Sequence, residues 1–170
     1  MRIAVCPGSF DPVTLGHLDV FERACRLFDK VVVGVVQVNS LSAKKYTFHL
    51  EERISLVKRV AAARGLDRLE VKPFSGLLVD FACQEGACAI VKGLRMMGDY
   101  EYELTYAIAN RKMSPQADGC PQVDTIFLPA GEAFLTVSSS AVREIGRYGG
   151  DLTPYLPPEI LEDVKARLRE

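Results

Sequence analysis

The 170-residue sequence predicts an α/β fold built on a five-stranded parallel sheet, and three observations carry this prediction. Strand-like apolar runs alternate with helix-like amphipathic runs along the whole chain, which is typical of βαβ units. The run 30–38 is rich in valine, as expected of a strand buried on both faces. Unusual polar residues follow several strands, and in a parallel sheet these positions share one edge. Because βαβ crossovers are right-handed, we expect a Rossmann-like, doubly wound sheet with helices on both faces and a C-terminal helix.

Each strand is expected where a short apolar run meets a polar or glycine-containing segment. Residues 2–6 form such a run at the start of the chain, and 30–38 is β-branched over most of its length. The runs 69–74 and 88–91 each follow a glycine that ends a helical pattern. The fifth strand is expected at 123–129.

The helices are expected where apolar residues recur at helical spacing. In 50–64 this spacing is clear, and Gly65 directly after it is a common helix stop. Pro157 and Pro158 precede the last helix, since proline is favoured in a first turn. The expected helices are 17–28, 50–64, 77–84, 100–113, 139–148 and 160–168.

The composition predicts one soluble domain spanning residues 1–170. Hydrophobic residues make up 48% and charged residues 25% of the chain, which is ordinary for a globular protein. The net charge of -1 argues against nucleic-acid partners, which require a basic excess. We find no signal-peptide pattern at the start and no apolar run of membrane-spanning length, so we expect a cytoplasmic protein without a membrane partner.

The cysteine pattern favours a reducing compartment. The five cysteines are odd in number and form no CxxC pair. Cys6 and Cys25 lie in apolar periodic segments, so we expect them to be buried free thiols.

The segment 8–17, Gly-Ser-Phe-Asp-Pro-Val-Thr-Leu-Gly-His, is the most informative part of the chain. It joins the first strand to the first helix, where glycines and a helix N-terminus hold phosphates in α/β proteins. Thr14 and His17 add a hydroxyl and an imidazole at the helix start. A lone histidine is more often a cap or a solvated side chain, but the turn and Gly16 before it favour donation to a phosphoryl oxygen.

Basic residues follow two further strands. Lys44 and Lys45 lie in the loop after the second strand, where two lysines are also common as solvated charge. Lys92, Gly93 and Arg95 come after the fourth strand. Lysine supplies a point charge, arginine supplies a planar fork for phosphate oxygens, and glycine lets the backbone approach a ligand.

Hydroxyls and carboxylates complete the predicted edge. The segment 136–140 precedes a helix, so its hydroxyls are natural caps that also leave backbone N–H groups open to an anion. Asp99 and Glu101 are explained by the positive end of a helix alone. Glu103 is a candidate for binding a ribose or a base.

No group of His, Cys, Asp and Glu residues has the spacing of metal ligands. We therefore expect no metal held by the protein itself. Any Mg²⁺ would enter with nucleotide phosphates, held mainly by phosphate oxygens and water.

Together these residues resemble the T/HxGH nucleotidyltransferase superfamily and, more narrowly, the bacterial phosphopantetheine adenylyltransferase family. The first motif alone indicates the superfamily, and the later motifs indicate the narrower family. The resemblance extends over essentially the whole chain. The motifs are P-G-S-F-D-P-V-T-L-G-H at 7–17, L-E-E-R at 50–53, K-G-L-R at 92–95, D-Y-E-Y-E at 99–103 and V-S-S-S at 137–140.

The resemblance implies transfer of the adenylyl group of ATP to 4′-phosphopantetheine. Dephospho-coenzyme A and pyrophosphate would form by direct in-line attack, in the penultimate step of coenzyme A synthesis. It also implies a homohexamer and binding of coenzyme A as a feedback ligand.

The resemblance assigns roles residue by residue. His17 would stabilise the transition state, with Lys44 and Arg95 as further catalytic residues. The acceptor would contact Ser9, Lys44, Leu78 and Lys92; the choice between Lys44 and Lys45 stays open. ATP would contact Ser9, Phe10, His17, Gly93, Leu94, Arg95, Glu103, Phe134, Leu135, Thr136, Val137, Ser138, Ser139 and Ser140.

Two alternatives remain. One is an adenylyl- or cytidylyltransferase of the same superfamily with a different acceptor, against which K-G-L-R and D-Y-E-Y-E argue. The other is a non-catalytic module that senses nucleotides, since a fold alone does not fix a function. The presence of His17, Lys44 and Arg95 argues against a pure sensor.

Overall fold

A five-stranded parallel sheet forms the centre of the computed structural model, which describes residues 1–37, 45–114, 120 and 122–169. The strand order is β3-β2-β1-β4-β5, so the chain winds outward from β1 to one edge and then returns to build the other. This confirms the predicted doubly wound sheet. The strands are β1 (Ile3–Gly8), β2 (Lys30–Val36), β3 (Leu69–Phe74), β4 (Ala89–Leu94) and β5 (Asp124–Pro129).

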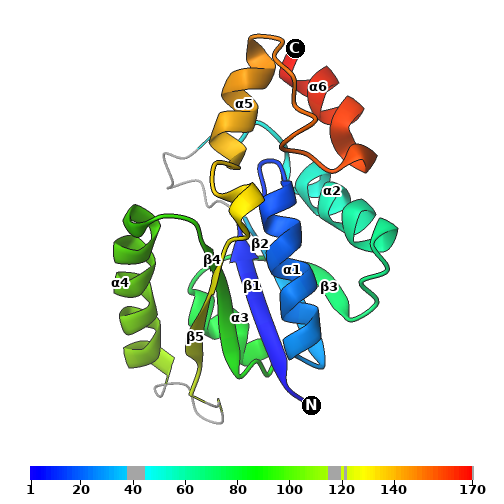
Figure 1. Cartoon of the computed structure of the whole chain (residues 1–170). Coiled ribbons are helices and arrows are strands. Elements are labelled where there is room, and N and C mark those ends of the chain that lie inside the picture. Colours follow the sequence, from blue (N-terminus) through cyan, green and yellow to red (C-terminus); the bar gives the residue numbers. More distant parts are fainter. Residues whose placement is uncertain (38–44, 115–119, 121, 170) are drawn as a thin grey trace.

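Helices cover both faces of this sheet, as Figure 1 shows. Helices α1 and α2 lie on one face, and α3 lies on the other. Helices α5 and α6 pack together beyond the carboxyl ends of the strands. The bounds are α1 (Leu15–Leu27), α2 (Leu50–Ala63), α3 (Leu78–Gln84), α4 (Met97–Met113), α5 (Ser139–Arg147) and α6 (Leu161–Arg169).

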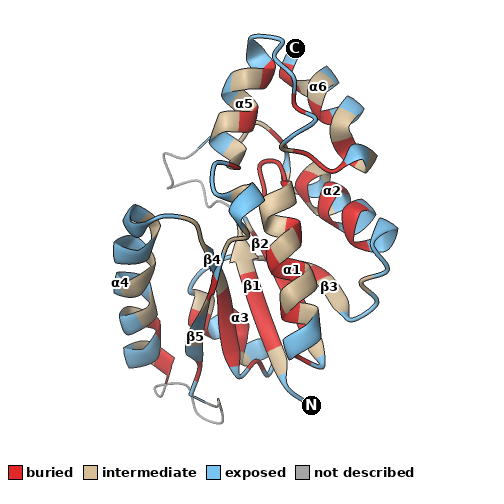
Figure 2. Ribbon diagram, in the orientation of Figure 1, coloured by how far each residue is buried: buried red, intermediate tan, exposed pale blue. Residues whose placement is uncertain are grey.

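Successive strand residues serve opposite faces, because side chains alternate along a strand. Ala4 and Cys6 of β1 belong to the larger core, which includes α1, α2, α5 and α6. Val5, between them, packs with Phe81 and Ala82 of α3 in a smaller second core. Figure 2 shows the central strands buried, whereas much of α4 is exposed.

Two element bounds differ from the prediction in ways that affect the site. The fourth strand continues to Leu94 instead of ending at residue 91, because its ladder with β5 extends to the pair of Leu94 with Pro129. Lys92 and Gly93 therefore lie in the strand rather than after it. The first helix begins at Leu15 rather than His17, since Thr14 caps it.

One disulfide joins two cysteines for which no specific expectation follows from the sequence. Cys83 of α3 is bonded to Cys120, and their Cα atoms lie 5.4 Å apart. Their separation of 37 positions hides this proximity in the sequence. Cys6 and Cys25 are free as predicted, but only Cys6 is buried, whereas Cys25 is half-buried. Burial raises the pKa of Cys6 to about 12.

None of the helices in the described ranges combines the length and apolar character needed to cross a bilayer.

Candidate active site

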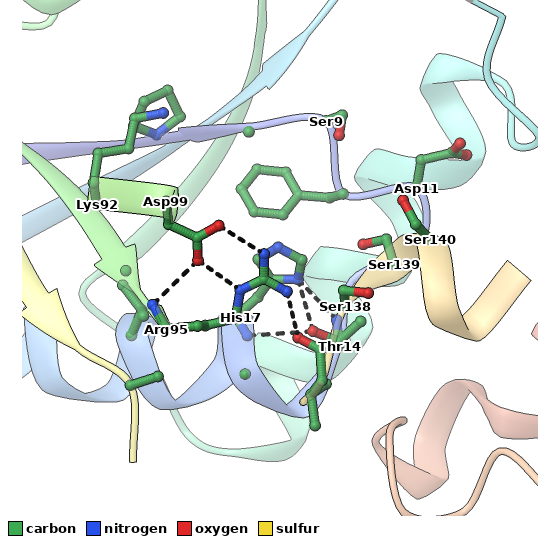
Figure 3. A pocket seen from close by; sticks show the side chains of 18 of the residues that line it. Ser9, Asp11, Thr14, His17, Lys92, Arg95, Asp99, Ser138, Ser139 and Ser140 are labelled. Atoms are coloured by element: carbon green, nitrogen blue, oxygen red, sulfur yellow. Dashed lines mark hydrogen bonds and ion pairs between the residues drawn. The ribbon is translucent and has the colours of Figure 1, made fainter. Parts of the chain in front are cut away.

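A cavity of about 690 Å³ lies at the carboxyl ends of β1 and β4 (Figure 3). These strands are neighbours at the point where the winding of the sheet reverses, which is where open α/β sheets bind ligands. The starts of α1, α4 and α5 complete its walls. The polar positions that the sequence places after separate strands therefore meet at one site.

His17 faces this cavity as a neutral hydrogen-bond donor. Its Nδ1 accepts the backbone N–H of Thr14 at 3.1 Å and lies 3.0 Å from the Thr14 hydroxyl. Since Nδ1 acts as an acceptor there, the proton of the neutral ring lies on Nε2. Burial and, to a lesser extent, the positive charge of Arg95 lower the pKa of His17 to about 4. The imidazole therefore offers an N–H group without a net charge.

The turn after β1 supports this histidine through Phe10. The Phe10 ring is buried and meets the His17 ring edge-on, with 5.1 Å between the ring centres. A Cβ atom at Gly8 would lie 2.7 Å from the tip of the Phe10 ring, so only glycine leaves it room. Phe10 itself adopts a φ of 47°, a strained value for a bulky side chain.

Helix α4 provides a carboxylate partner for each of the two predicted cations, Lys92 in β4 and Arg95 directly after β4. Lys92 pairs with Glu103 at 3.3 Å, and both side chains are mostly buried. Nε of Arg95 donates to Asp99 at 3.0 Å, and its Nη1 donates to the carbonyl of Val137 at 3.1 Å. Asp99 therefore does more than complement the helix end.

The electrostatics of Asp99 follow from this contact. Burial opposes its ionisation, but hydrogen bonds from the Arg95 side chain and backbone hold the pKa of Asp99 below its ordinary value. Asp99 is therefore ionised at neutral pH, and it holds the Arg95 guanidinium through hydrogen bonds from Nε and Nη2 (Figure 3).

Packing between α1 and β4 requires a glycine at position 93, which the sequence alone does not indicate. A Cβ atom there would lie 2.7 Å from Cγ2 of Val20, which belongs to α1. The glycine lets α1 approach β4 closely and so brings the start of α1 next to the end of β4.

The start of α5 forms the remaining wall. The Ser138 hydroxyl caps the helix by accepting the N–H of Ala141 at 3.1 Å, and Ser139 donates to the carbonyl of Pro12 at 2.8 Å. A helix N-terminus fixed in this way presents backbone N–H groups to an anion. The cap expected in 136–140 is confirmed, and anion binding there stays a prediction.

Several residues at the cavity were not assigned roles from the sequence. Asp11, Tyr46 and Arg143 line it together with Thr14 and Asp99. Asp11 lies inside the glycine-rich segment 8–17, and a carboxylate in a turn of this kind could have indicated a role at the site. Tyr46 and Arg143 carried no comparable signal.

The predicted site residues divide into two sets. Those that line the cavity are Ser9, Phe10, His17, Lys92, Gly93, Arg95, Glu103, Val137, Ser138, Ser139 and Ser140. Those that the structure does not bring to its lining are Leu78, Leu94, Phe134, Leu135 and Thr136. Lys44 lies outside the described residues, whereas Lys45 lines the cavity.

The residues outside the lining lie there for different reasons. Leu78, the first residue of α3, packs against the second core. Leu94 is the last residue of β4 and does not belong to the cavity lining. Phe134 ends a short 3₁₀ helix, and only from Val137 onward does this segment reach the cavity.

Comparisons with known proteins agree with this geometry. A family model described as cytidylyltransferase-like matches residues 5–145. Curated proteins named phosphopantetheine adenylyltransferase match over nearly their full lengths. The protein from Streptomyces coelicolor is 47% identical over 99% of both chains, and that from Clostridium tetani is 44% identical over 96% of both.

A solved structure shows the same fold. The putative nicotinate-nucleotide adenylyltransferase of Vibrio parahaemolyticus superposes with a TM-score of 0.67, covering 98% of this chain and 96% of that one. At 19% identity, this likeness concerns the fold alone.

Proposed function

Because the chain belongs to the phosphopantetheine adenylyltransferase family of cytidylyltransferase-like proteins, we propose that it transfers the adenylyl group of ATP to 4′-phosphopantetheine. The products are dephospho-coenzyme A and pyrophosphate, as in the penultimate step of coenzyme A synthesis. The observation that carries the proposal is the neutral N–H of His17, which faces a cavity whose walls hold Lys92 and Arg95.

The reaction needs alignment more than a strong base. An oxygen of the acceptor phosphate attacks the α-phosphorus of ATP, and the bond to the bridging oxygen of the β-phosphate breaks in line with it. The attacking phosphate is already an anion, so no covalent enzyme intermediate is required. The Nε2–H of His17 donates to an α-phosphate oxygen as negative charge develops there.

The two substrates approach from opposite sides of His17. The acceptor phosphate is placed near Ser9, Lys92 and the lysine pair at 44 and 45, of which Lys45 lines the cavity. The triphosphate lies against Arg95 and the start of α5, and Glu103 accepts from the adenosine. The backbone of Phe10 and Gly93 supplies the close approach that ATP requires.

Mg²⁺ belongs to ATP in this proposal. In the part of the chain that the structure describes, no three His, Cys, Asp or Glu side chains gather to hold a metal ion. Asp11, Asp99 and Glu103 at the cavity each face a basic side chain instead. The residues present therefore do not form a resident metal site, and no step above depends on one.

We propose that the chain assembles as the homohexamer implied by its family resemblance. Helix α4 and strand β5 carry exposed apolar side chains available for contact with another copy, namely Met97, Tyr106, Ile108 and Ile126. Light scattering after size exclusion is expected to give six times the 18.7 kDa monomer mass. An Ile108→Glu variant should run smaller, and a monomeric wild type would contradict the assembly.

An acceptor-competition assay tests the activity. Purified protein with ATP and Mg²⁺ should release pyrophosphate when 4′-phosphopantetheine is added, and not with pantothenate or nicotinamide mononucleotide. Turnover with another acceptor would indicate a different transferase of the superfamily. ATP binding without release would indicate a sensing module. Coenzyme A, which carries both the adenosine and the pantetheine arm, should inhibit by competing at the same cavity.

A further inference from the structure

The arginine of the L-E-E-R motif, Arg53, is a buried charge that the proposed reaction does not use. It lies in α2 with 2% of its surface exposed. Its Nη1 donates to the carbonyl oxygens of Ser9 at 2.7 Å and of Val36 at 3.0 Å. Its guanidinium lies 4.2 Å from the centre of the Tyr46 ring. Arg53 therefore connects the turn after β1, the end of β2 and the segment before α2.

Asp11 makes the complementary connection in the opposite direction. It is 3% exposed, and its two carboxylate oxygens accept the backbone N–H groups of Thr47 at 3.1 Å and of Phe48 at 2.9 Å. Arg143 of α5 lies 3.5 Å from the same carboxylate. Through Asp11, the turn after β1 thus binds the segment before α2. Through Arg53, helix α2 in turn binds the turn after β1.

Burying these two charges is unfavourable unless backbone groups satisfy them. Burial lowers the pKa of Arg53, although the neighbouring Tyr46 and Asp11 oppose this effect. Its Nε atom is buried and finds no hydrogen-bond partner in the described part of the chain. An apolar side chain at this position would avoid both penalties, but it would leave the carbonyls of Ser9 and Val36 unpaired.

The segments that the two residues join are themselves parts of the cavity wall. Ser9, Asp11 and Tyr46 all line it, and Lys45 is next to Tyr46. The carbonyl that Arg53 holds directly precedes Phe10, whose φ of 47° is strained. A strained conformation of this kind persists only where its surroundings fix it.

We propose that Arg53 and Asp11 form a clasp that positions the acceptor side of the cavity, so that Arg53 is a positioning residue for the acceptor phosphate. The clasp fixes the Ser9 backbone and the Lys45–Tyr46 segment relative to each other before the ligand binds. This inference rests on the proposed function, because it names which substrate depends on Arg53.

A lysine at position 53 tests the clasp. Arg53→Lys keeps the charge but not the planar fork that reaches two carbonyls. Steady-state pyrophosphate release should show a KM for 4′-phosphopantetheine raised roughly 10-fold or more, and raised clearly more than the KM for ATP, which also contacts the Ser9–Phe10 turn. Arg59→Lys is the matched control, since Arg59 lies in the same helix and binds the Glu159 carbonyl and Asp163 away from the cavity. It should leave both KM values unchanged.

Amide hydrogen exchange tests the Asp11 half of the clasp, and this experiment does not require the Arg53 variant to fold. Asp11→Asn leaves one oxygen where two N–H groups bind, so exchange at Thr47 or Phe48 should accelerate about 10-fold or more relative to wild type. The KM for the acceptor should rise in the same variant.

The outcomes separate the two proposals. A wild type that releases no pyrophosphate overturns the proposed function. An active wild type overturns the clasp alone if Arg53→Lys leaves the acceptor KM unchanged or raises both KM values equally. Unchanged exchange at Thr47 and Phe48 in the Asp11 variant also overturns it.

Discussion

The two sides of the cavity hold their charges in different ways. On the acceptor side, Asp11 and Arg53 are almost fully buried and bind backbone groups of neighbouring segments. On the nucleotide side, Arg95 pairs with Asp99, and these two side chains stay 35% and 31% exposed.

This difference separates two physical tasks. Buried charges that satisfy backbone groups fix the position of the chain, and their removal leaves unpaired polar atoms. Partly exposed ion pairs are weak, about 0 to 1 kcal/mol each, so a cation in such a pair can exchange its partner for a ligand phosphate at small cost. We infer that the acceptor side is organised in advance, whereas the nucleotide side reorganises its contacts on binding.

The largest effect is expected at His17, which lies between the two sides. His17→Ala should lower kcat by about 100- to 1000-fold, as for loss of one donor to a developing charge. Affinity for ATP, measured by calorimetry, should change less than about threefold because Arg95 and the start of α5 remain. His17→Gln keeps an N–H donor and should lose less. Near-native turnover of His17→Ala would contradict the role of the imidazole.

The next largest effect is expected on folding stability, where one arginine from each side of the cavity can be compared. Arg53→Met leaves two carbonyls unpaired and should lower the free energy of unfolding by about 3 kcal/mol. Arg95→Met breaks a partly exposed pair and should lower it by less than about 1 kcal/mol, while weakening ATP binding. Urea unfolding measures both. Equal losses in the two variants would remove the distinction between the sides.

The sequence indicates residues of local motifs better than residues that act over long separations, for a physical reason. Arg95 follows a glycine near a strand end, and His17 ends a glycine-rich turn, so the neighbouring residues alone indicate a role for each. Arg53 acts on Ser9 across 44 residues, a contact that only the folded chain creates. Its motif was visible, but a helical arginine is ordinarily a solvated charge.

Other contacts between segments far apart in the sequence are equally hard to predict from local patterns. Alternating patterns predict the order and type of the strands, because burial on two faces selects their residues. They do not predict the disulfide of Cys83 with Cys120, nor the carboxylates that α4 brings to β4. Leu78, assigned by resemblance alone, packs against the second core outside the cavity lining, and its contact with the acceptor stays a prediction.

A pH titration tests the protonation state of His17, which lies between the two sides of the cavity. The pKa of His17 is lowered to about 4, against about 6.5 for an unfolded chain, so only the unfolded state takes up a proton between these values. Stability should therefore fall as the pH drops from about 6.5 towards 4, by about 1 to 2 kcal/mol from this residue because its ring stays partly open to the cavity. Above pH 6.5 its contribution is constant.

Two measurements check this dependence. The chain has two histidines, so His49→Gln leaves one imidazole NMR signal, whose midpoint should lie near pH 4. Unfolding of His17→Gln should lack the part of the pH dependence that His17 causes in wild type. A midpoint near 6.5 would mean that the ring enters catalysis as a cation at acidic pH.

The smallest effect is expected from removing one carboxylate on the nucleotide side. Asp99→Asn weakens the hydrogen bonds that orient Arg95, but backbone contact with Val137 still holds the guanidinium. The KM for ATP should rise less than about fivefold, consistent with a partly exposed pair. Asp11→Asn provides the contrast, since its effect should be larger and fall on the acceptor. If Asp99→Asn proved as damaging to ATP as Asp11→Asn is to the acceptor, the nucleotide side would also be organised in advance, and the burial of charge would not decide which substrate finds its site prepared.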